Sequence, residues 1–180
     1  MLRLILNDDH LSDALGEAMT ACKHRLFIVT ADVKDLYIPL AAGGKRRKRG
    51  VSILEVFREL SQRDVEIDLL HSGVPSGPFL EDLKTGGIPA NLVMRRCVRV
   101  HAKAIIADGK WMYMGSANLT GAGLGAKSAK RRNFEAGICT DDLSLIDPVA
   151  DMLQEIFTGG QCPGCGRKEH CPVPLEEPEV

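Results

Sequence analysis

Apolar residues in the first part of the chain alternate between short runs and helical repeats. Leu2–Leu6 and Leu26–Thr30 are short apolar runs that predict strands. The same pattern gives a helix over Ile53–Leu60 and a strand over Val65–Leu69, where apolar and acidic residues alternate. Between the first two strands, apolar residues recur at helical spacing and predict another helix: Leu11, Leu15, Ala18, Met19 and Cys22.

The rest of the chain continues this alternation. Phe79–Leu83 predicts a short helix and Leu92–Met94 a short strand. Val98–Ile106 is predicted as a strand, Lys110–Met114 as its return, and Phe134–Cys139 as a further strand. Because strands and helices alternate, we expect an α/β fold with a mixed β-sheet flanked by helices on both faces.

The last predicted helix begins at Asp147-Pro148, because proline is favoured in the first turn of a helix. Gly159-Gly160 ends this helix. Its buried stripe is expected to consist of Val149, Met152, Leu153 and Ile156. The chain is thereby divided into a domain over residues 1–160 and a tail over residues 161–180 that is rich in cysteine and histidine.

Composition narrows the class of protein. Hydrophobic residues make up 44% and charged residues 26% of the 180 residues, as expected of a globular domain with one core. No apolar run reaches about 18 residues, so no transmembrane helix is predicted. The first residues turn acidic at Asp8 and lack the apolar stretch of a signal peptide. Together with six cysteines that have no secreted context, this favours a cytoplasmic protein.

The residues with the clearest chemistry lie in one segment, HAKAIIADGKWMYMGSAN. His101 and Lys103 are two apart in a predicted strand, so their side chains share one face. Asp108-Gly109 predicts a two-residue hairpin turn, and the return strand then brings Ser116 and Asn118 beside His101. A nucleophilic imidazole, a cation and two short polar side chains are therefore predicted to meet at one point.

This pattern resembles the HKD motif of the phospholipase D superfamily, in which His-x-Lys is followed by four residues, Asp, six residues and Gly-Ser-x-Asn. Both gaps and all six positions are present: His101, Lys103, Asp108, Gly115, Ser116 and Asn118. An acidic residue follows the motif in this family, and Glu135 is the matching position. The resemblance extends to about Ile138. Among the branches of the superfamily, the sequence is most similar to the nuclease-like, Zucchini-like one.

The resemblance implies a phosphodiesterase that works through a phosphohistidine intermediate and needs no metal for catalysis. One histidine attacks phosphorus, and a second protonates the leaving oxygen. Lys103 would supply a positive charge, and Ser116 and Asn118 would donate hydrogen bonds to the phosphate oxygens. We expect Glu135 to orient the ring of a catalytic histidine, whereas Asp108 holds the hairpin and does not contact the substrate.

The chain contains a single such motif. The other histidines have no lysine two residues later: His10, His24, His71 and His170. Since the mechanism needs two histidines, a two-fold dimer would have to supply them by bringing the same surface of each subunit to its axis. Single-motif members of the superfamily, including small bacterial nucleases and the Zucchini-type endoribonucleases, are built this way. We therefore predict a homodimer with one shared active site.

Basic residues are clustered although the net charge is only −1. From Arg95 to Arg132 the only acidic residue is Asp108, against nine basic ones. Five more form an unbroken run bounded by glycines: Lys45, Arg46, Arg47, Lys48 and Arg49. This run is either a solvated loop or, together with Arg131 and Arg132, a surface that follows the phosphate backbone of DNA or RNA.

The tail contains four side chains that can bind a metal: Cys162, Cys165, His170 and Cys171. The C-x2-C half, with Pro163-Gly164 as its turn, is typical of structural zinc sites. The adjacent His170-Cys171 pair fits a four-coordinate site less well, so Cys97 or Cys139 is an alternative ligand. Free thiols and an iron–sulfur cluster are the other interpretations.

Two other functions are compatible with these residues. A phospholipid hydrolase or phosphatidyl transferase would use the same phosphorus chemistry, but the sequence shows no basic amphipathic helix with aromatic anchors. A nucleic-acid-binding subunit of a restriction or defence complex would keep the fold without turnover. The leading interpretation is a metal-independent endonuclease that cleaves DNA or RNA, has no stable membrane association and contains at most a structural zinc.

Overall fold

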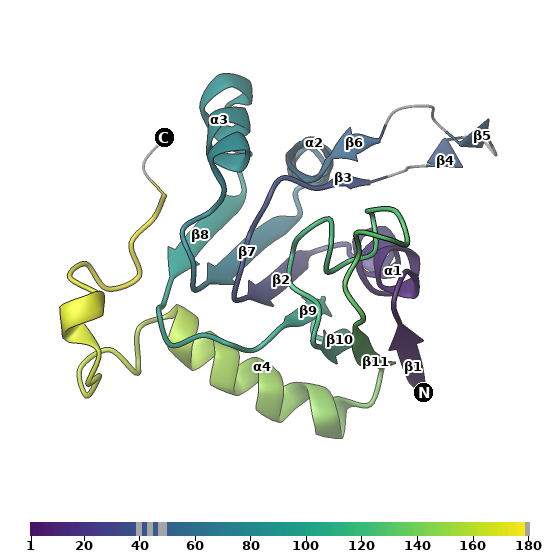
Figure 1. Cartoon of the computed structure of the whole chain (residues 1–180). Helices are drawn as coiled ribbons and strands as arrows, with labels where there is room; N and C mark the ends of the chain where they lie inside the picture. The colour runs from purple at the N-terminus through teal and green to yellow at the C-terminus, as the bar shows by residue number, and fades with distance from the viewer. Residues whose placement is uncertain (39–40, 43–44, 47–49, 179–180) are drawn as a thin grey trace.

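The computed structural model describes residues 1–38, 41–42, 45–46 and 50–178. A seven-stranded sheet forms the centre of the molecule (Figure 1), with the strand order β1-β11-β10-β9-β2-β7-β8. Its strands are β1 (Leu2–Leu6), β2 (Arg25–Thr30), β7 (Glu66–His71), β8 (Leu92–Arg96), β9 (Ala104–Ala107), β10 (Trp111–Gly115) and β11 (Ala136–Thr140). β2, β7 and β8 run parallel, whereas β9, β10, β11 and β1 alternate in direction, so the sheet is mixed as predicted.

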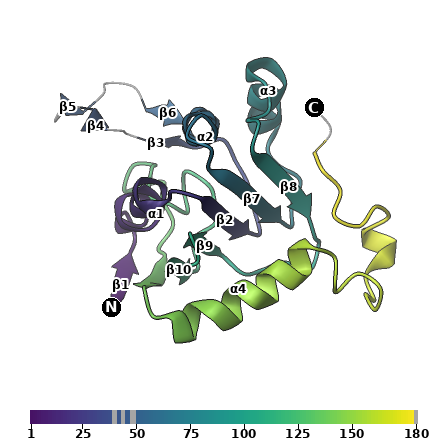
Figure 2. The ribbon, with the colours of Figure 1, turned by 180° about the vertical axis from the view of Figure 1, so that it is seen from behind.

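Helices cover both faces of this sheet (Figures 1 and 2). The helical elements are η1 (His10–Gly16), α1 (Glu17–Ala21), α2 (Ile53–Ser61), α3 (Gly77–Gly86), α4 (Leu143–Phe157) and the short η2 (Lys168–His170). η1, α1, α2 and α3 pack on one face, and α4 packs alone on the other. In the described part of the chain, no helix is long and apolar enough to cross a membrane.

The position of β2 inside the sheet explains why its sequence is apolar at nearly every position. Leu26 and Ile28 point into the core that contains α2, whereas Phe27 and Val29 point into the core beneath α4. A strand buried on both faces requires such a continuous apolar run. The first apolar run of the chain differs, because β1 lies at the sheet edge and buries only Ile5 fully.

The chain between β2 and α2 contains four two-residue strands. They are β3 (Tyr37–Ile38), β4 (Ala41–Ala42), β5 (Lys45–Arg46) and β6 (Val51–Ser52). β3 pairs with β6 and β4 pairs with β5, and the latter pair lies at the outer end of this segment (Figure 1). Of the predicted basic run, Lys45 and Arg46 form β5, whereas Arg47, Lys48 and Arg49 lie outside the described residues.

Two predicted boundaries are wrong by four residues or more. The strand expected over Val98–Ile106 begins only at Ala104, because the chain must first cross from β8 at the sheet edge to β9 on the far side of β2. The last helix begins at Leu143 instead of at Asp147-Pro148, since the Asp142 carboxylate caps it by accepting from Ser144 N at 3.0 Å.

The early start of α4 also changes its buried stripe. Ile146, Leu153 and Phe157 are buried beneath it, while Met152 is 49% exposed. Beyond α4, the tail consists of turns and η2. Arg96 N donates to the Glu176 carbonyl at 3.1 Å, and the Arg96 side chain pairs with the Glu176 carboxylate, so the tail lies along the end of β8.

Candidate active site

His101 and Lys103 lie in the connection that leads directly into β9. The Lys103 ammonium donates to the His101 carbonyl at 2.8 Å and lies 3.3 Å from Nε2 and 3.4 Å from Nδ1 of the His101 ring. His101 is exposed, whereas Lys103 is only 8% exposed. No carboxylate in the described part of the chain pairs with Lys103. A buried cation with only neutral partners favours the binding of an anion.

The turn after β9 has the geometry that its sequence predicts. Asp108 and Gly109 have φ angles of 54° and 65°, as a type I′ turn requires, and Lys110 N donates to the Ala107 carbonyl at 3.0 Å. The Asp108 carboxylate accepts from three successive backbone N–H groups at 2.8–2.9 Å, those of Lys23, His24 and Arg25.

These bonds explain the electrostatics of Asp108. Burial would raise the pKa of its carboxyl, but the three N–H groups outweigh burial and lower this pKa to about 2. Asp108 follows the last residue of β9, whereas His101 precedes the first. The carboxylate therefore ties the hairpin to the start of β2 and does not lie beside the histidine.

Gly115 and Ser116 join this site from the end of β10. Gly115 N donates to the Lys103 carbonyl at 3.1 Å, which ties the two parts of the motif together. A Cβ atom at Gly115 would lie 2.7 Å from the Ala136 carbonyl oxygen and would collide with the Tyr113 hydroxyl, so only glycine fits. Ser116 Oγ accepts from Ala136 N at 3.1 Å and donates to the Glu135 carboxylate.

Glu135 lies just before β11, beside the motif. Its second carboxylate oxygen accepts from Asn133 Nδ2 at 2.9 Å, and its backbone N–H donates to Asn7 Oδ1 at 3.3 Å. Within the residues that the structure describes, no hydrogen bond joins Glu135 to a histidine of the same chain. The predicted role of Glu135 in orienting a histidine ring therefore stays a prediction.

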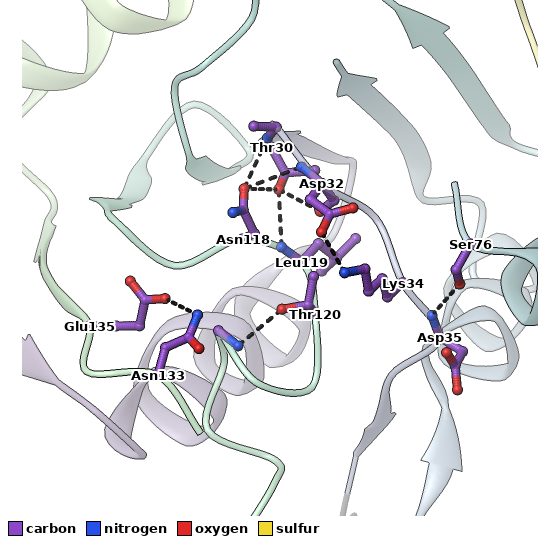
Figure 3. A network of polar contacts seen from close by, with 12 residues as sticks. Thr30, Asp32, Lys34, Asp35, Ser76, Asn118, Leu119, Thr120, Asn133 and Glu135 are labelled. Atoms are coloured by element: carbon purple, nitrogen blue, oxygen red, sulfur yellow. Dashed lines mark hydrogen bonds and ion pairs between the residues drawn. The ribbon is translucent and has the colours of Figure 1, made fainter. Parts of the chain in front are cut away.

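The Asn118 side chain is held by the end of β2 (Figure 3). Its Oδ1 accepts from Thr30 Oγ1 at 3.2 Å, from Ala31 N at 3.1 Å and from Asp32 N at 3.2 Å. Thr30 Oγ1 also accepts from Leu119 N at 3.0 Å. Three donors on one oxygen fix the orientation of the amide, so its Nδ2 points away from β2 and remains a donor.

The sequence motif did not indicate Thr30. This residue is 1% exposed and ends the apolar strand β2. The available signal was weak: Thr30 is a hydroxyl residue at the last position of an otherwise apolar run. Its link to Asn118 became visible only with the sheet order, which places β9 beside β2.

Two of the residues predicted to bind nucleic acid, Arg131 and Arg132, lie in the long loop between β10 and β11. Arg132 forms a 2.7 Å ion pair with Asp8, so part of its charge is already compensated. Arg131 is exposed. Nearby in the sequence, Phe134 is 94% exposed, which is unusual for a phenylalanine.

The predicted metal ligands of the tail are only partly brought together. Cys162, Cys165 and Cys171 line a cavity of about 430 Å³, and Cys97 lines it as well. His170 is outside the cavity, with Nε2 3.0 Å from a Glu169 carboxylate oxygen. Among the described residues, no group of three or more histidine, cysteine, aspartate or glutamate side chains is placed so that it could hold a metal ion.

Cys139, the other alternative ligand, lies elsewhere. It is fully buried in the core on the α1 side, and its Sγ is 3.5 Å from the Asp13 carbonyl. Burial raises the pKa of its thiol to about 11. Cys139 is therefore a core residue that is not available to the tail.

Comparisons with solved structures show the same fold. NucT from Helicobacter pylori matches with a TM-score of 0.60 at 16% identity, over 86% of this chain and 94% of NucT. Nuc from Salmonella typhimurium, a phospholipase D family member, gives a TM-score of 0.59 at 16% identity, over 86% and 92%. Phosphatidylserine synthase from Haemophilus influenzae gives 0.55 at 14% identity, over 86% of this chain and 38% of the synthase.

A search of the curated proteins found no match. The family model described as "Cardiolipin synthase, PLD-like domain" matches residues 15–158, which are most of the chain. The match includes β2, β9, β10 and β11 and therefore all the motif residues. The chain belongs to the phospholipase D-like family.

Proposed function

We propose that this protein is a metal-independent endonuclease that cleaves DNA or RNA through a phosphohistidine intermediate. The observation that carries the proposal is the pairing of an exposed imidazole, His101, with a buried ammonium, Lys103, that no carboxylate of the described residues neutralises. The oriented amide of Asn118 adds a donor at the same end of the sheet. A phosphodiester fits this combination because it presents a phosphorus atom to a nucleophile and negative oxygens to fixed donors.

The proposed reaction has two displacements. In the first, a nitrogen of His101 forms a bond to phosphorus, the bond from phosphorus to the leaving oxygen breaks, and a second histidine donates a proton to that oxygen. In the second, the same histidine takes a proton from water, the water oxygen attacks phosphorus, and the bond to His101 breaks. Lys103 and Asn118 stabilise the charge on the non-bridging oxygens throughout.

The second histidine is proposed to be the partner subunit's His101. Support comes from an apolar face of the sheet that α4 leaves uncovered, which we call the open sheet face: Leu2, Leu4, Leu6, Met114 and Ile138. Leu4 is opposite Ile138, which is opposite Met114, so the three side chains form one row across β1, β11 and β10. Leu4 is 65% exposed and Met114 39%. Such a patch is typical of an interface.

The position of the open sheet face fits a shared site. Met114 is two residues before Ser116, so the face reaches the end of the sheet that carries the motif. A two-fold axis through this end would bring two copies of His101 together. We infer that the exposed Phe134, directly before Glu135, belongs to the same interface.

Nucleic acid is the proposed substrate because of the charge around the motif. From Arg95 to Arg132 the sequence has nine basic residues and one acidic residue, Asp108, whose carboxylate is occupied by backbone N–H groups. Two of the nine pair with carboxylates elsewhere in the chain, Arg96 with Glu176 and Arg132 with Asp8. A basic surface next to a phosphate-binding cation favours a polyanion, and its binding should weaken steeply with salt. Lys45–Arg49, Arg131 and Arg132 remain the proposed contacts to the phosphate backbone.

The decisive experiment compares wild type with His101→Ala in the presence of EDTA. We expect wild type to cut labelled single- or double-stranded DNA or RNA, and His101→Ala to lose on the order of 10³-fold or more in rate while still binding the substrate. His24→Ala changes an exposed histidine outside the motif and is the matched control. Phosphatidylcholine and cardiolipin vesicles are assayed in parallel.

Three results would contradict the proposal. Cleavage of lipid alone would identify a phospholipase. Nucleic-acid binding without turnover by wild type would identify a binding subunit. Turnover that returns only when magnesium is restored would exclude a mechanism that relies on histidine alone.

A further inference from the structure

The cavity between α4 and the tail is a feature that the proposed nuclease activity does not use. It is lined by Cys97, Cys162, Cys165 and Cys171, all free thiols and all partly buried. They come from two distant parts of the sequence: Cys97 directly follows β8, and the other three lie in the tail. Two of the six cysteines, Cys22 and Cys139, are buried in the core and do not line this cavity.

From this arrangement we propose a structural zinc site with four thiolate ligands, Cys97, Cys162, Cys165 and Cys171. Four thiolates in a closed tetrahedral set are a standard structural zinc site. Cys97 replaces His170 of the tail, because His170 is exposed beside Glu169 and does not line the cavity. The inference is independent of the proposed nuclease activity.

The local backbone is suited to such a site. Cys165 N donates to the Cys162 carbonyl at 3.2 Å, so Cys162-Pro163-Gly164-Cys165 forms a tight turn that presents two thiols together. Cys97 is held from outside the tail, since its N–H donates to the His71 carbonyl at 2.8 Å. Among the described residues no three such side chains are placed so that they could hold a metal ion, so binding requires the four thiols to move together.

Four thiolates without a cation would repel one another, and a divalent ion removes that repulsion. Zinc with four thiolates leaves a net charge of −2, and basic side chains are present to balance it. Arg99 Nη1 lies 3.8 Å from Cys165 Sγ, and Lys168 lines the same cavity.

The site would act on the segment that leads into the motif. Cys97 is four residues before His101, and Val98 and Val100 line the cavity between them. A metal bridging Cys97 to the tail would therefore fix the position of this connection and anchor the end of the chain. Otherwise the tail is held by the contacts between Arg96 and Glu176 and by Leu175, which packs against the core beneath α4.

The first test measures metal content in the full chain, purified without chelator. We expect about one zinc per chain by mass spectrometry of the metals. Cys97→Ser should lower zinc affinity about tenfold or more, since loss of an outer-shell partner alone costs that much. His170→Ala is the matched control and should keep full zinc content.

A second test needs no variant. Iodoacetamide labelling is compared with and without zinc, and the modified cysteines are identified by peptide mass spectrometry. Zinc should protect Cys97, Cys162, Cys165 and Cys171 together. The proposal is overturned if no zinc binds, if iron and sulfide are found instead, if Cys162 and Cys165 form a disulfide, or if His170→Ala loses zinc while Cys97→Ser retains it.

Discussion

At the scale of single residues, the candidate site depends on how a few polar atoms are oriented. Asn118 could present either its oxygen or its nitrogen to a phosphate, and only the nitrogen is useful to an anion. Thr30 and the backbone N–H groups of Ala31 and Asp32 occupy the oxygen. The end of β2 thus acts on the substrate through Asn118, and Thr30 is a positioning residue.

We predict that Thr30→Val lowers the rate of phosphodiester cleavage about 10-fold to 100-fold, because the Asn118 oxygen loses one of its three donors and the amide is held less firmly. The substitution keeps the side-chain volume but removes the hydroxyl that contacts both Asn118 and Leu119. Thr30→Ser restores the hydroxyl and should recover most of the activity. Rates are measured on a labelled oligonucleotide at saturating concentration. Equal loss in both variants would show that the hydroxyl does not position the amide.

At the scale of elements, the hairpin β9–β10 is positioned by a contact at its far end. The Asp108 carboxylate caps three N–H groups at the start of β2, in the connection from α1. The antiparallel pairing of β2 with β9 is therefore fixed at one end by Asp108, and the motif residues lie at the other end. Asp108 therefore fixes the register between β2 and β9. A substitution of Asp108 is expected to lower the stability of the fold before it affects the motif residues at the other end.

We predict that Asp108→Ala lowers the free energy of unfolding by about 2–3 kcal/mol, because three backbone N–H groups lose a charged acceptor, and that of Arg25 is part-buried. The effect should depend on pH. The pKa of Asp108 is lowered to about 2 in the folded chain from its usual 3.8, so its contribution is complete above pH 4 and is lost as the pH falls toward 2.

Denaturant unfolding at pH 7 and at pH 2–3 measures both parts of this prediction. Asp9→Ala is the control, since Asp9 is exposed and its side chain does not cap the helix that follows it. Asp108→Ala and wild type should converge in stability at the acid end. If the difference between them were the same at both pH values, the carboxylate charge would not be the cause.

The sequence predicts the elements well where burial alone decides them. Leu26–Thr30 is a strand because both its faces are covered, and the Asp108-Gly109 turn follows from local backbone preference. The segment before β9 could not be predicted in this way. Val98 and Val100 are apolar because they pack toward α4 and the tail, so their alternation imitates a strand in a crossing connection.

The contacts of the candidate site divide in the same way, into local ones that the sequence predicts and long-range ones that depend on the whole fold. The spacing of the motif predicts the contacts of Lys103 with His101 and with Gly115, since these contacts are made within one hairpin and its approach. The Thr30–Asn118 contact joins residues 88 positions apart and depends on the strand order of the whole sheet. The presence of Cys97, and not His170, in the lining of the cavity beside the tail is likewise a matter of tertiary packing.

At the scale of the whole molecule, the sheet is covered unevenly. α4 packs over Phe27, Ile106 and Met112 and leaves the open sheet face, next to the edge strand β1, exposed. Apolar burial stabilises by about 25 cal/mol per Å², so a monomer that leaves such a face in water forgoes a large contribution. An exposed edge strand also invites association. Both features are resolved if two copies meet at this face.

We predict that wild type runs at about twice the 19.6 kDa of one chain in light scattering, and that Leu4→Glu converts it to a monomer. A glutamate in the row of Leu4, Ile138 and Met114 would bury an unpaired charge in the interface, which costs several kcal/mol. The monomer should also lose nuclease activity, because each copy retains its own His101 but has no second histidine to protonate the leaving oxygen.

Ile88→Glu provides the matched control for this change. Ile88 is 54% exposed and lies before β8, at the opposite edge of the sheet from β1, so the same charge there should leave both mass and activity unchanged. A Leu4→Glu monomer that still cleaves at the wild-type rate would mean that one chain supplies both proton-transfer groups. In that event the shared active site would be wrong, while the assignment of His101 as nucleophile would still depend on its own variant.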